Sequence, residues 1–437
     1  MKVLSLFDGM ACGMLAMLRQ GIEVERYVAY EIDKYAIQTS THNFPMIEHR
    51  GDVFLADFTE FKGFDYIVGG SPCTYWSIAQ KNNRETEASG MGWELFSQYV
   101  RAIKEVEPKY FIYENNKSMS KAIRESITDT FGFEPILINS ALVSAQNRQR
   151  LYWVGKRNAD GTYSKVEVEQ PIERGILLKD ILEDGVVDKD KSYVLKHQAG
   201  NARDYFKKHH TQIKFEPVRI PEYGIEDKAR PLGAYYQNNC GGFEHRMFSD
   251  NPNKQQVDMI AEPINTTDDG KLQTIKAQLP STINVGSLPG SNGEPSESQS
   301  AQIYDINGKS STLCANGGGA GAKTGLYAVP VNTCYAVAIE WDEDGKPIKA
   351  ISGADGKVYQ VYEVKDGLIT IKDKQYPINL ADGFYIIRKL TVRECMRLQT
   401  IPEWYEFPVS DTQAYKMLGN GWTVDVIAHL ISFIPIE

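Results

Sequence analysis

The chain has 437 residues, of which 42% are hydrophobic, 24% charged and 11% aromatic. This is ordinary globular composition at a length sufficient for two or three domains, which excludes a disordered chain, a collagen-like chain and a small disulfide-stapled scaffold. The formal net charge of −9 argues against a protein that coats nucleic acid with a uniformly basic surface, although it leaves room for a local basic face.

The cysteines and the N-terminal segment bear on the compartment. The six cysteines lie at least 20 residues apart, so we expect reduced thiols, no disulfide framework and no Cys-x-x-Cys metal site. The sequence reaches the charged Asp8 before a signal-peptide apolar core develops, and no apolar run is long enough to span a membrane. We therefore expect a cytoplasmic protein with no membrane partner and no metal.

Short β-prone runs alternate with helical stretches over the first 155 residues. Strands are predicted over 3–7, 26–31, 66–69, 110–114, 135–139 and 151–155, and a helix over 14–20 ends at Gly21. This alternation predicts an α/β, doubly wound Rossmann-like fold with a parallel sheet covered on both faces.

From about residue 190 the composition shifts to Gly, Asn, Ser, Thr and Pro with short β-prone runs. Hairpins are predicted over 358–384, with turns at 366–367 and 382–383, and a Gly-Lys-x-x-Thr pattern at 270–277 recurs at 308–315, by repetition or by coincidence. Helical periodicity returns over 391–399 and 424–433. We therefore predict a first domain over 1–188, a β-rich domain over 189–387 and a C-terminal return over 388–437 that completes the first domain.

A glycine-containing loop, FDGMACG over residues 7–13, follows the first predicted strand and opens the first helix. Glycines there let backbone N–H groups approach a ligand at the positive end of the helix. Glu31 lies 22 residues after Gly9, the separation at which such folds place a carboxylate on ribose hydroxyls. Asp52 could accept a hydrogen bond from an adenine amino group; the alternative is that it is a solvated turn residue. The pattern favours an adenosine-bearing cofactor, and the absence of a Gly-Lys-Ser/Thr phosphate loop gives an ATPase no support.

Two reactive side chains follow neighbouring predicted strands. Cys73 ends Gly-Gly-Ser-Pro-Cys after the strand over 66–69, and Glu114 ends the strand over 110–114. The carboxyl edge of such a sheet holds ligands and reactive groups, so Cys73 is a candidate nucleophile beside a carboxyl group. A buried structural thiol and a surface acid are the alternatives.

Arg148 and Arg150 precede the strand over 151–155 and point to the same side by alternation. Forked cations suit phosphate or carbonyl oxygens, and structural salt bridges are the alternative. Near the C-terminus, Gly419-Asn420-Gly421-Trp422 enters the last predicted helix and offers small residues and free amides to a ligand.

In this order the motifs resemble those of the C5-cytosine-specific DNA methyltransferases, over nearly the whole catalytic framework. The motif sequences are of phage or bacterial type, and LFDG, SPC and Trp422 are similar to those of the animal de novo enzymes. Thr74 and Gly421 differ from the Gln and Ser that are usual at these positions. The resemblance implies transfer of a methyl group from S-adenosylmethionine to C5 of a cytosine flipped out of duplex DNA. It implies a covalent Cys73 adduct at C6, with S-adenosylhomocysteine as product.

The resemblance also assigns residues. Cys73 is the expected nucleophile, Glu114 and Arg150 are expected to hold the cytosine, and Arg148 to assist. Cofactor-binding residues are expected at Phe7, Asp8, Gly9, Met10, Gly13, Glu31, Ile32, Asp52, Val53, Gly70, Pro72, Asn420, Gly421 and Trp422. DNA-binding residues are expected at Ser77, Lys207, Lys208 and Arg230.

The segment between the two arginines and Arg388 is expected to recognise the DNA target. Residues 189–254 contain 12 Lys and Arg against 8 Asp and Glu, the sign required for a surface that faces phosphates. We expect a monomer in the cytoplasm of a bacterium or of a phage-infected host cell.

Two alternatives stay open: cytosine-5 methylation of RNA, whose chemistry would be identical, and a catalytically silent DNA-binding homologue. Zinc-dependent base deamination is excluded because no cysteine follows Cys73 at the required spacing. A dehydrogenase would explain the nucleotide-binding fold but would leave Cys73, Glu114 and the arginines without a role.

Overall fold

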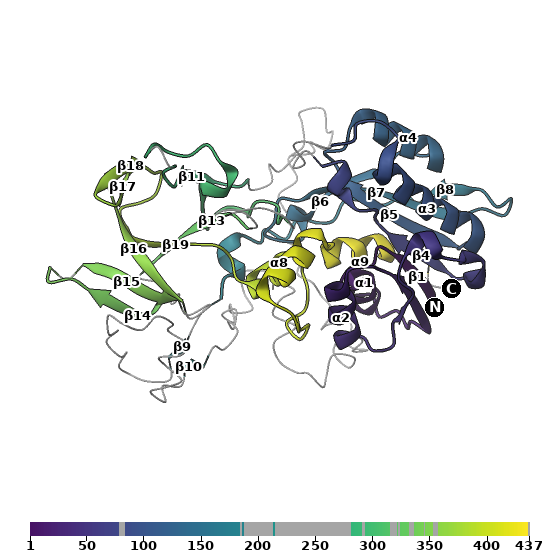
Figure 1. Cartoon of the computed structure of the whole chain (residues 1–437), viewed down its shortest axis with the longest axis horizontal. Coiled ribbons are helices and arrows are strands. Elements are labelled where there is room, and N and C mark those ends of the chain that lie inside the picture. Colours follow the sequence, from purple (N-terminus) through teal and green to yellow (C-terminus); the bar gives the residue numbers. More distant parts are fainter. Residues whose placement is uncertain are drawn as a thin grey trace, which may run out of the picture.

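The computed structural model describes residues 1–77, 84–183, 186–187, 213–214, 281–290, 293–314, 321, 324–331, 336–344, 346–352 and 357–435. Two large sheets lie toward opposite ends of an elongated molecule, with helix α8 (Asp411–Asn420) between them (Figure 1). Within the described residues, no helix combines the length and the apolar character needed to cross a bilayer.

The first sheet has eight strands in the order β3-β2-β1-β4-β5-β7-β6, with β8 beside β7. Its strands are β1 (Lys2–Leu6), β2 (Arg26–Tyr30), β3 (Glu48–His49), β4 (Tyr66–Gly69), β5 (Tyr110–Asn116), β6 (Ile136–Asn139), β7 (Gln149–Arg157) and β8 (Tyr163–Lys165). Strands β1 to β5 are parallel and largely buried, as expected for strands covered on both faces.

Helices cover both faces of this sheet, and each face has its own apolar core. On one face lie α1 (Cys12–Arg19), α2 (Lys34–Asn43) and α9 (Val424–Ser432). On the other lie α3 (Gly90–Val106) and α4 (Lys121–Phe131). The predicted doubly wound α/β fold is therefore confirmed.

The sheet is not wholly parallel, because β7 runs antiparallel to both β5 and β6. Only residues 140–148 connect β6 to β7, whereas a parallel crossover needs a dozen or more residues. Strand β5 is also longer than predicted: Glu114 lies inside it, and the strand continues to Asn116.

The second sheet has nine strands in the order β11-β12-β13-β19-β16-β15-β14, extended by β17 and β18. Its strands are β11 (Asn284–Ser287), β12 (Gln302–Asp305), β13 (Leu326–Pro330), β14 (Ala336–Trp341), β15 (Pro347–Ser352), β16 (Val358–Lys365), β17 (Leu368–Ile371), β18 (Lys374–Pro377) and β19 (Gly383–Arg388). Short strands β9 (Val186–Val187) and β10 (Ile213–Lys214) pair separately.

The hairpin from β16 to β17 turns at Asp366 and Gly367, as predicted, with φ of 54° and 71°. Positive φ at both central residues gives the turn whose twist suits a two-residue hairpin. The turn predicted at 382–383 is wrong as a hairpin turn, because Gly383 begins β19, which pairs with β13 and β16 rather than with β18.

After β19 the chain returns to the first sheet through three helices. Helix α7 (Val392–Leu398) begins at a capping box in which Thr391 and Glu394 each accept from the other's backbone N–H. Glu394 also forms a two-pronged ion pair with Arg388, and both side chains are 0% exposed. Helices α8 and α9 follow, and α9 packs against α1.

Part of the predicted recognition region lies outside the described residues. This applies to Lys207, Lys208 and Arg230, to nearly all of the basic segment 189–254, and to the first copy of the Gly-Lys-x-x-Thr pattern.

Candidate active site

The predicted nucleophile follows β4 at the carboxyl edge of the first sheet. Cys73 is partly exposed and begins the short 3₁₀ helix η3 (Cys73–Tyr75), directly after the exposed Pro72. A Cβ atom on Gly70 would lie 2.6 Å from the backbone oxygen of Glu114 and 2.9 Å from its Oε2. Glycine at position 70 is therefore what allows the loop after β4 to pass so close to β5.

Glu114 projects from β5 at the same edge and is 9% exposed. Its Oε1 lies 3.0 Å from Nε of Arg150, and its Oε2 accepts a hydrogen bond of 3.0 Å from Nε1 of Trp422. Each carboxylate oxygen has a donor, so the plane of this carboxylate is fixed by two elements that lie far apart in the sequence.

The two predicted arginines have different partners. Arg150 lies in β7 opposite Asn116 of β5 and pairs with Glu114. Arg148 is buried, and its guanidinium donates to the backbone oxygens of Gly419 at 3.2 Å and Gly421 at 2.9 Å. Arg148 therefore holds the end of α8 against the carboxyl edge of the sheet.

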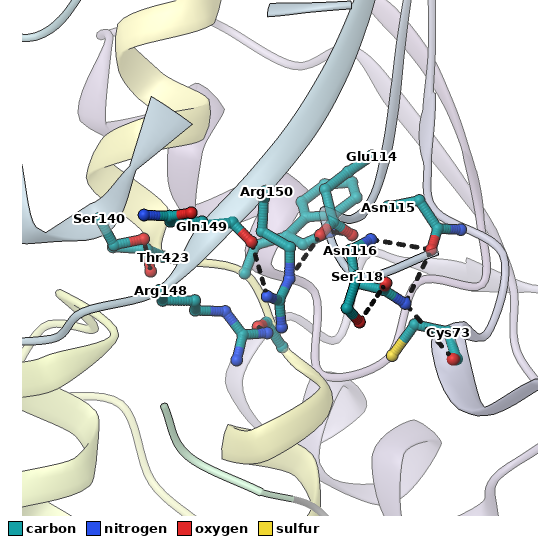
Figure 2. Close-up of polar contacts among 12 residues, drawn as sticks. Cys73, Glu114, Asn115, Asn116, Ser118, Ser140, Arg148, Gln149, Arg150 and Thr423 are labelled. Atoms are coloured by element: carbon teal, nitrogen blue, oxygen red, sulfur yellow. Dashed lines mark hydrogen bonds and ion pairs between the residues drawn. The ribbon is translucent and has the colours of Figure 1, made fainter. Parts of the chain in front are cut away.

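The four predicted catalytic residues are electrostatic neighbours. The pKa of Arg148 is lowered to about 10, chiefly by burial and also by the charge of Arg150, while Glu114 and Cys73 oppose this shift. In the view of Figure 2 the two arginines lie on one side of Glu114 and Cys73 on the other. A planar group that needs both a cation and a carboxylate could contact them beside the thiol.

A buried polar network joins the Cys73 loop to β5, and sequence reasoning missed it. The hydroxyls of Ser71 and Tyr113 lie 2.6 Å apart and share a hydrogen bond. The Asn115 amide donates to the backbone oxygen of Ser71 at 3.2 Å. The Asn116 amide donates to the backbone oxygen of Cys73 at 3.5 Å (Figure 2). The two asparagines after Glu114 were the available signal, because paired amides on a buried strand need partners.

Ser77 lies one turn after Cys73. Its backbone N–H donates to the backbone oxygen of Cys73 at 2.9 Å, and the preceding Trp76 is fully buried. The described chain stops at Ser77 and resumes at Arg84.

The glycine-containing loop and Glu31 meet as the motif spacing predicts. Phe7 and Gly9 both have a φ of 59°, and the Gly9 N–H donates to Oε2 of Glu31 at 2.8 Å. The other Glu31 oxygen accepts from the N–H groups of Ile32 at 2.7 Å and Asp33 at 2.8 Å. A Cβ atom on Gly9 would meet nothing within 4 Å, and Ile32 is 74% exposed. An open backbone, a fixed carboxylate and an exposed apolar side chain are together suited to an adenosine group.

Three residues assigned to the cofactor point toward the core. The carboxyl group of Asp8 accepts a hydrogen bond of 2.7 Å from the hydroxyl of Tyr27, and burial raises the pKa of Asp8 to about 6. A Cβ atom on Gly13 would lie 2.7 Å from the same hydroxyl, so glycine serves the packing of α1 on β2. Met10 is buried, and its backbone oxygen accepts from Tyr405 at 2.6 Å.

Asp52 caps a short 3₁₀ helix, η1 (Val53–Leu55), by accepting from the Phe54 N–H at 3.0 Å. It is therefore more ordered than a solvated turn residue. The Val53 side chain is buried in the core, whereas Leu55 beside it is exposed.

The Gly-Asn-Gly-Trp segment ends one helix and precedes another. The exposed Asn420 is the last residue of α8, and Gly421 follows as its C-cap. A Cβ atom on Gly421 would lie 2.8 Å from Cε of Met10, so glycine permits close approach to the loop over residues 7–13. Trp422 leads into α9 as predicted, whereas Gly419 and Asn420 belong to the preceding helix α8. The Trp422 indole N–H donates to Glu114.

In the described parts of the chain, no group of three or more His, Cys, Asp or Glu side chains is arranged to hold a metal ion.

The family model for C-5 cytosine-specific DNA methylases matches residues 1–435. The chain belongs to this family. This methylase is therefore a DNA (cytosine-5)-methyltransferase, of a family that uses S-adenosylmethionine.

Similar proteins come from phages and bacteria. The methylase is 26% identical over 473 residues to orphan methyltransferase M.SPRI of Bacillus phage SPR, a match that covers 98% of this chain and 95% of that protein. It is 24% identical over 461 residues to type II methyltransferase M.HgiCI of Herpetosiphon aurantiacus, covering 99% and 97%. The solved structure of the Entamoeba histolytica methyltransferase EhMeth matches with a TM-score of 0.50 at 10% identity, covering 99% of this chain and 97% of that chain, which supports the fold alone.

Proposed function

We propose that this enzyme methylates C5 of a cytosine flipped out of duplex DNA, through a transient bond between Cys73 and C6 of the base. The observation that supports this most directly is the meeting of Cys73, Glu114 and Arg150 at one sheet edge, with Glu114 held by two donors. A base inside a duplex cannot reach a thiol on a sheet edge, which is why the target must leave the stack, at a cost of a few kcal/mol.

Cys73 acts as the nucleophile. Its thiolate attacks C6, the C5=C6 double bond opens, and the electron pair makes C5 nucleophilic. Glu114 shares a proton with N3 and accepts from the exocyclic amine, while Arg150 stabilises the O2 side. Once C5 is methylated, its proton leaves to a base, the double bond re-forms, and the Cys73 thiolate is expelled.

S-adenosylmethionine supplies the electrophilic methyl group when bound and is converted to S-adenosylhomocysteine. The adenosine part of the cofactor would be held by Phe7, Gly9, Glu31 and Ile32. Asp52 would contribute to the same site, because it too follows a strand of the first sheet. Arg148 would keep the α8 end and Gly421 against the same site through the two carbonyl bonds described above.

Residues 189–387 form the proposed target-recognition domain, between a catalytic domain over 1–188 and its completion over 388–437. Ser77, Lys207, Lys208 and Arg230 are proposed to contact DNA. Residues 189–254 contain 12 basic and 8 acidic residues, and this basic excess supports phosphate contacts there.

The test is transfer of labelled methyl from S-adenosylmethionine to duplex DNA and to an RNA of the same sequence, with base-resolution mapping of the product. We expect 5-methylcytosine in DNA. Cys73→Ala should lower the rate by about 10⁴-fold or more, because a nucleophile is removed.

Three outcomes would reject the proposal. Turnover that persists in Cys73→Ala would reject the covalent mechanism. Labelling confined to RNA would establish an RNA methyltransferase instead, and DNA binding without any transfer would establish a silent homologue.

A further inference from the structure

The two sheets are connected by a region that we name the domain joint, made of segments 139–148, 173–179 and 306–312. In it, the Ser310 N–H donates to the backbone oxygen of Ala145 at 2.7 Å, and the Asn147 N–H donates to that of Ser310 at 3.1 Å. The Leu178 N–H donates to the backbone oxygen of Gly308 at 3.0 Å. The second domain therefore adds a short extended segment directly to the connection between β6 and β7.

Lys309 lies at the centre of the domain joint and is 0% exposed. Its ammonium group donates to the backbone oxygens of Ala141 at 3.0 Å and Ser144 at 3.1 Å, and also to that of Ile176. Burial lowers the pKa of Lys309 to about 8, and the negative charges of Glu173 and Asp180 oppose that shift. A lysine ammonium has three N–H donors, and here each has a carbonyl acceptor.

Two of these carbonyls belong to the nine residues that lead into the proposed catalytic arginines. Residues 140–148 connect β6 to β7; Arg148 is the last residue of this connection, and Arg150 is the second residue of β7. The Ser144 hydroxyl donates to the backbone oxygen of Leu398 at 2.5 Å, and the Ser140 hydroxyl lies 2.9 Å from that of Thr423. The connection is thus held from the C-terminal return on one side and by Lys309 on the other.

We propose that Lys309 is a positioning residue, through which the second domain fixes the backbone that holds Arg148 against the end of α8 and aims Arg150 at the target base. This inference rests on the proposed roles of the two arginines. The three carbonyl oxygens converge on one point, and a single ammonium can satisfy all of them, whereas a neutral side chain of similar length leaves buried acceptors unpaired.

A displacement of about 1 Å at catalytic groups can lower a rate by about 10²-fold even when the change is made far from the chemistry. Relaxation of residues 140–148 would move both guanidinium groups together, because Arg148 and Arg150 lie at the end of this connection. The residues proposed to hold the adenosine part of the cofactor, Gly9 and Glu31, lie toward the opposite end of the sheet, so the affinity for the cofactor should fall less than kcat does.

The experiment compares Lys309→Met with Lys179→Met in the full-length enzyme. Lys179 is a matched control, because it is exposed and reaches Asn307 Oδ1 at 3.4 Å across the same joint. At saturating duplex DNA we expect Lys309→Met to lower kcat per folded molecule by about 10- to 100-fold. The affinity for S-adenosylmethionine, measured by calorimetry, should fall by a smaller factor than kcat, and Lys179→Met should behave as the parent enzyme. An unchanged kcat in Lys309→Met, or an equal loss in Lys179→Met, would overturn the proposal.

A double-mutant cycle with Arg150→Ala tests the route. If Lys309 acts through the arginines, the combined variant should lose less than the product of the two single losses. Multiplying losses would overturn the positioning role. Full activity of Arg150→Ala alone would instead reject the proposed function of Arg150.

Lys309→Gln keeps two N–H donors and should retain an intermediate kcat, which covers the case in which Lys309→Met does not fold. Failure of both variants to fold would make Lys309 a residue of stability only, and would contradict the positioning role.

Discussion

The edge of the first sheet that carries Glu114 and the domain joint both contain buried or partly buried cations, but these cations have different partners. At the edge, Arg150 pairs with the carboxylate of Glu114 at 3.0 Å and keeps some exposure. In the joint, Lys309 is fully buried and binds three neutral backbone oxygens. A cation that shares a carboxylate at an open edge can redirect its donors to a substrate. A cation that satisfies backbone carbonyls in the interior has no such freedom and fixes geometry instead.

The largest expected effect is on the rate of methyl transfer, when the ion pair between Glu114 and Arg150 at the sheet edge is removed. Glu114→Gln keeps the shape of the side chain but removes the charge that pairs with Arg150 and the proton that Glu114 is proposed to share with N3 of the base. We expect methyl transfer to fall by about 10²- to 10⁴-fold, the usual contribution of a positioned acid or base. The measurement is single-turnover transfer of labelled methyl to duplex DNA.

Glu107→Gln is the matched control for this change, because Glu107 lies on the surface and pairs with Lys62 at 2.9 Å. It should leave transfer unchanged. A Glu114→Gln enzyme with parental single-turnover rates would show that the edge carboxylate has no chemical role.

The second prediction concerns the ion pair between the second sheet and α7. Arg388→Met leaves the fully buried Glu394 without its cation, which should lower the free energy of unfolding by about 3–5 kcal/mol. The measurement is urea denaturation followed by circular dichroism.

Arg393→Met provides the comparison, because Arg393 lies in α7, the helix that carries Glu394. Its side chain is 43% exposed, and its Nε lies 3.5 Å from Oε1 of Glu183. Such a pair contributes about 0–1 kcal/mol. Equal losses in the two variants would show that burial does not distinguish these ion pairs.

The smallest predicted effect is a pH dependence of the free energy of unfolding, which arises at Asp8 in the loop over residues 7–13. The pKa of Asp8 is raised from 3.8 to about 6 by burial, so the folded state binds this proton more tightly than the unfolded state. The stability that this provides is fully present below pH 3.8 and is lost as the pH rises through about 6. The difference in unfolding free energy between the parent and Asp8→Asn should therefore fall between pH 4 and pH 6.5, as measured by urea denaturation. A difference that is constant or rises over this range would contradict a buried neutral carboxyl group at Asp8.

Much of the fold was predictable, because parallel strands that are covered on both faces are short apolar runs between helices. Strand β4 was predicted to the residue, and β1, β2 and β6 to within one residue. The direction of β7 was not predicted, because an apolar run looks the same in either direction and only the short connection over 140–148 determines it.

The proximity of Gly9 to Glu31 followed from local spacing, since one strand-helix-strand unit fixes it. The bond from Trp422 to Glu114 did not, because it joins residues 308 apart in the chain. The role of Lys309 was also hidden. A lysine in a Gly-Lys-Ser-Ser turn resembles a surface residue until the fold brings the oxygens of residues 141, 144 and 176 around it.

The contact between Trp422 and Glu114 has a consequence for when the enzyme can first work. Domains fold largely in order of synthesis on the ribosome, and the sheet that carries Cys73 and Glu114 is translated hundreds of residues before Trp422. A nascent chain can therefore form the loop that carries Cys73 and still lack the Trp422 indole that holds the Glu114 carboxylate. Because Trp422 belongs to the proposed active site, polypeptides that end before residue 422 should leave cytosines unmodified.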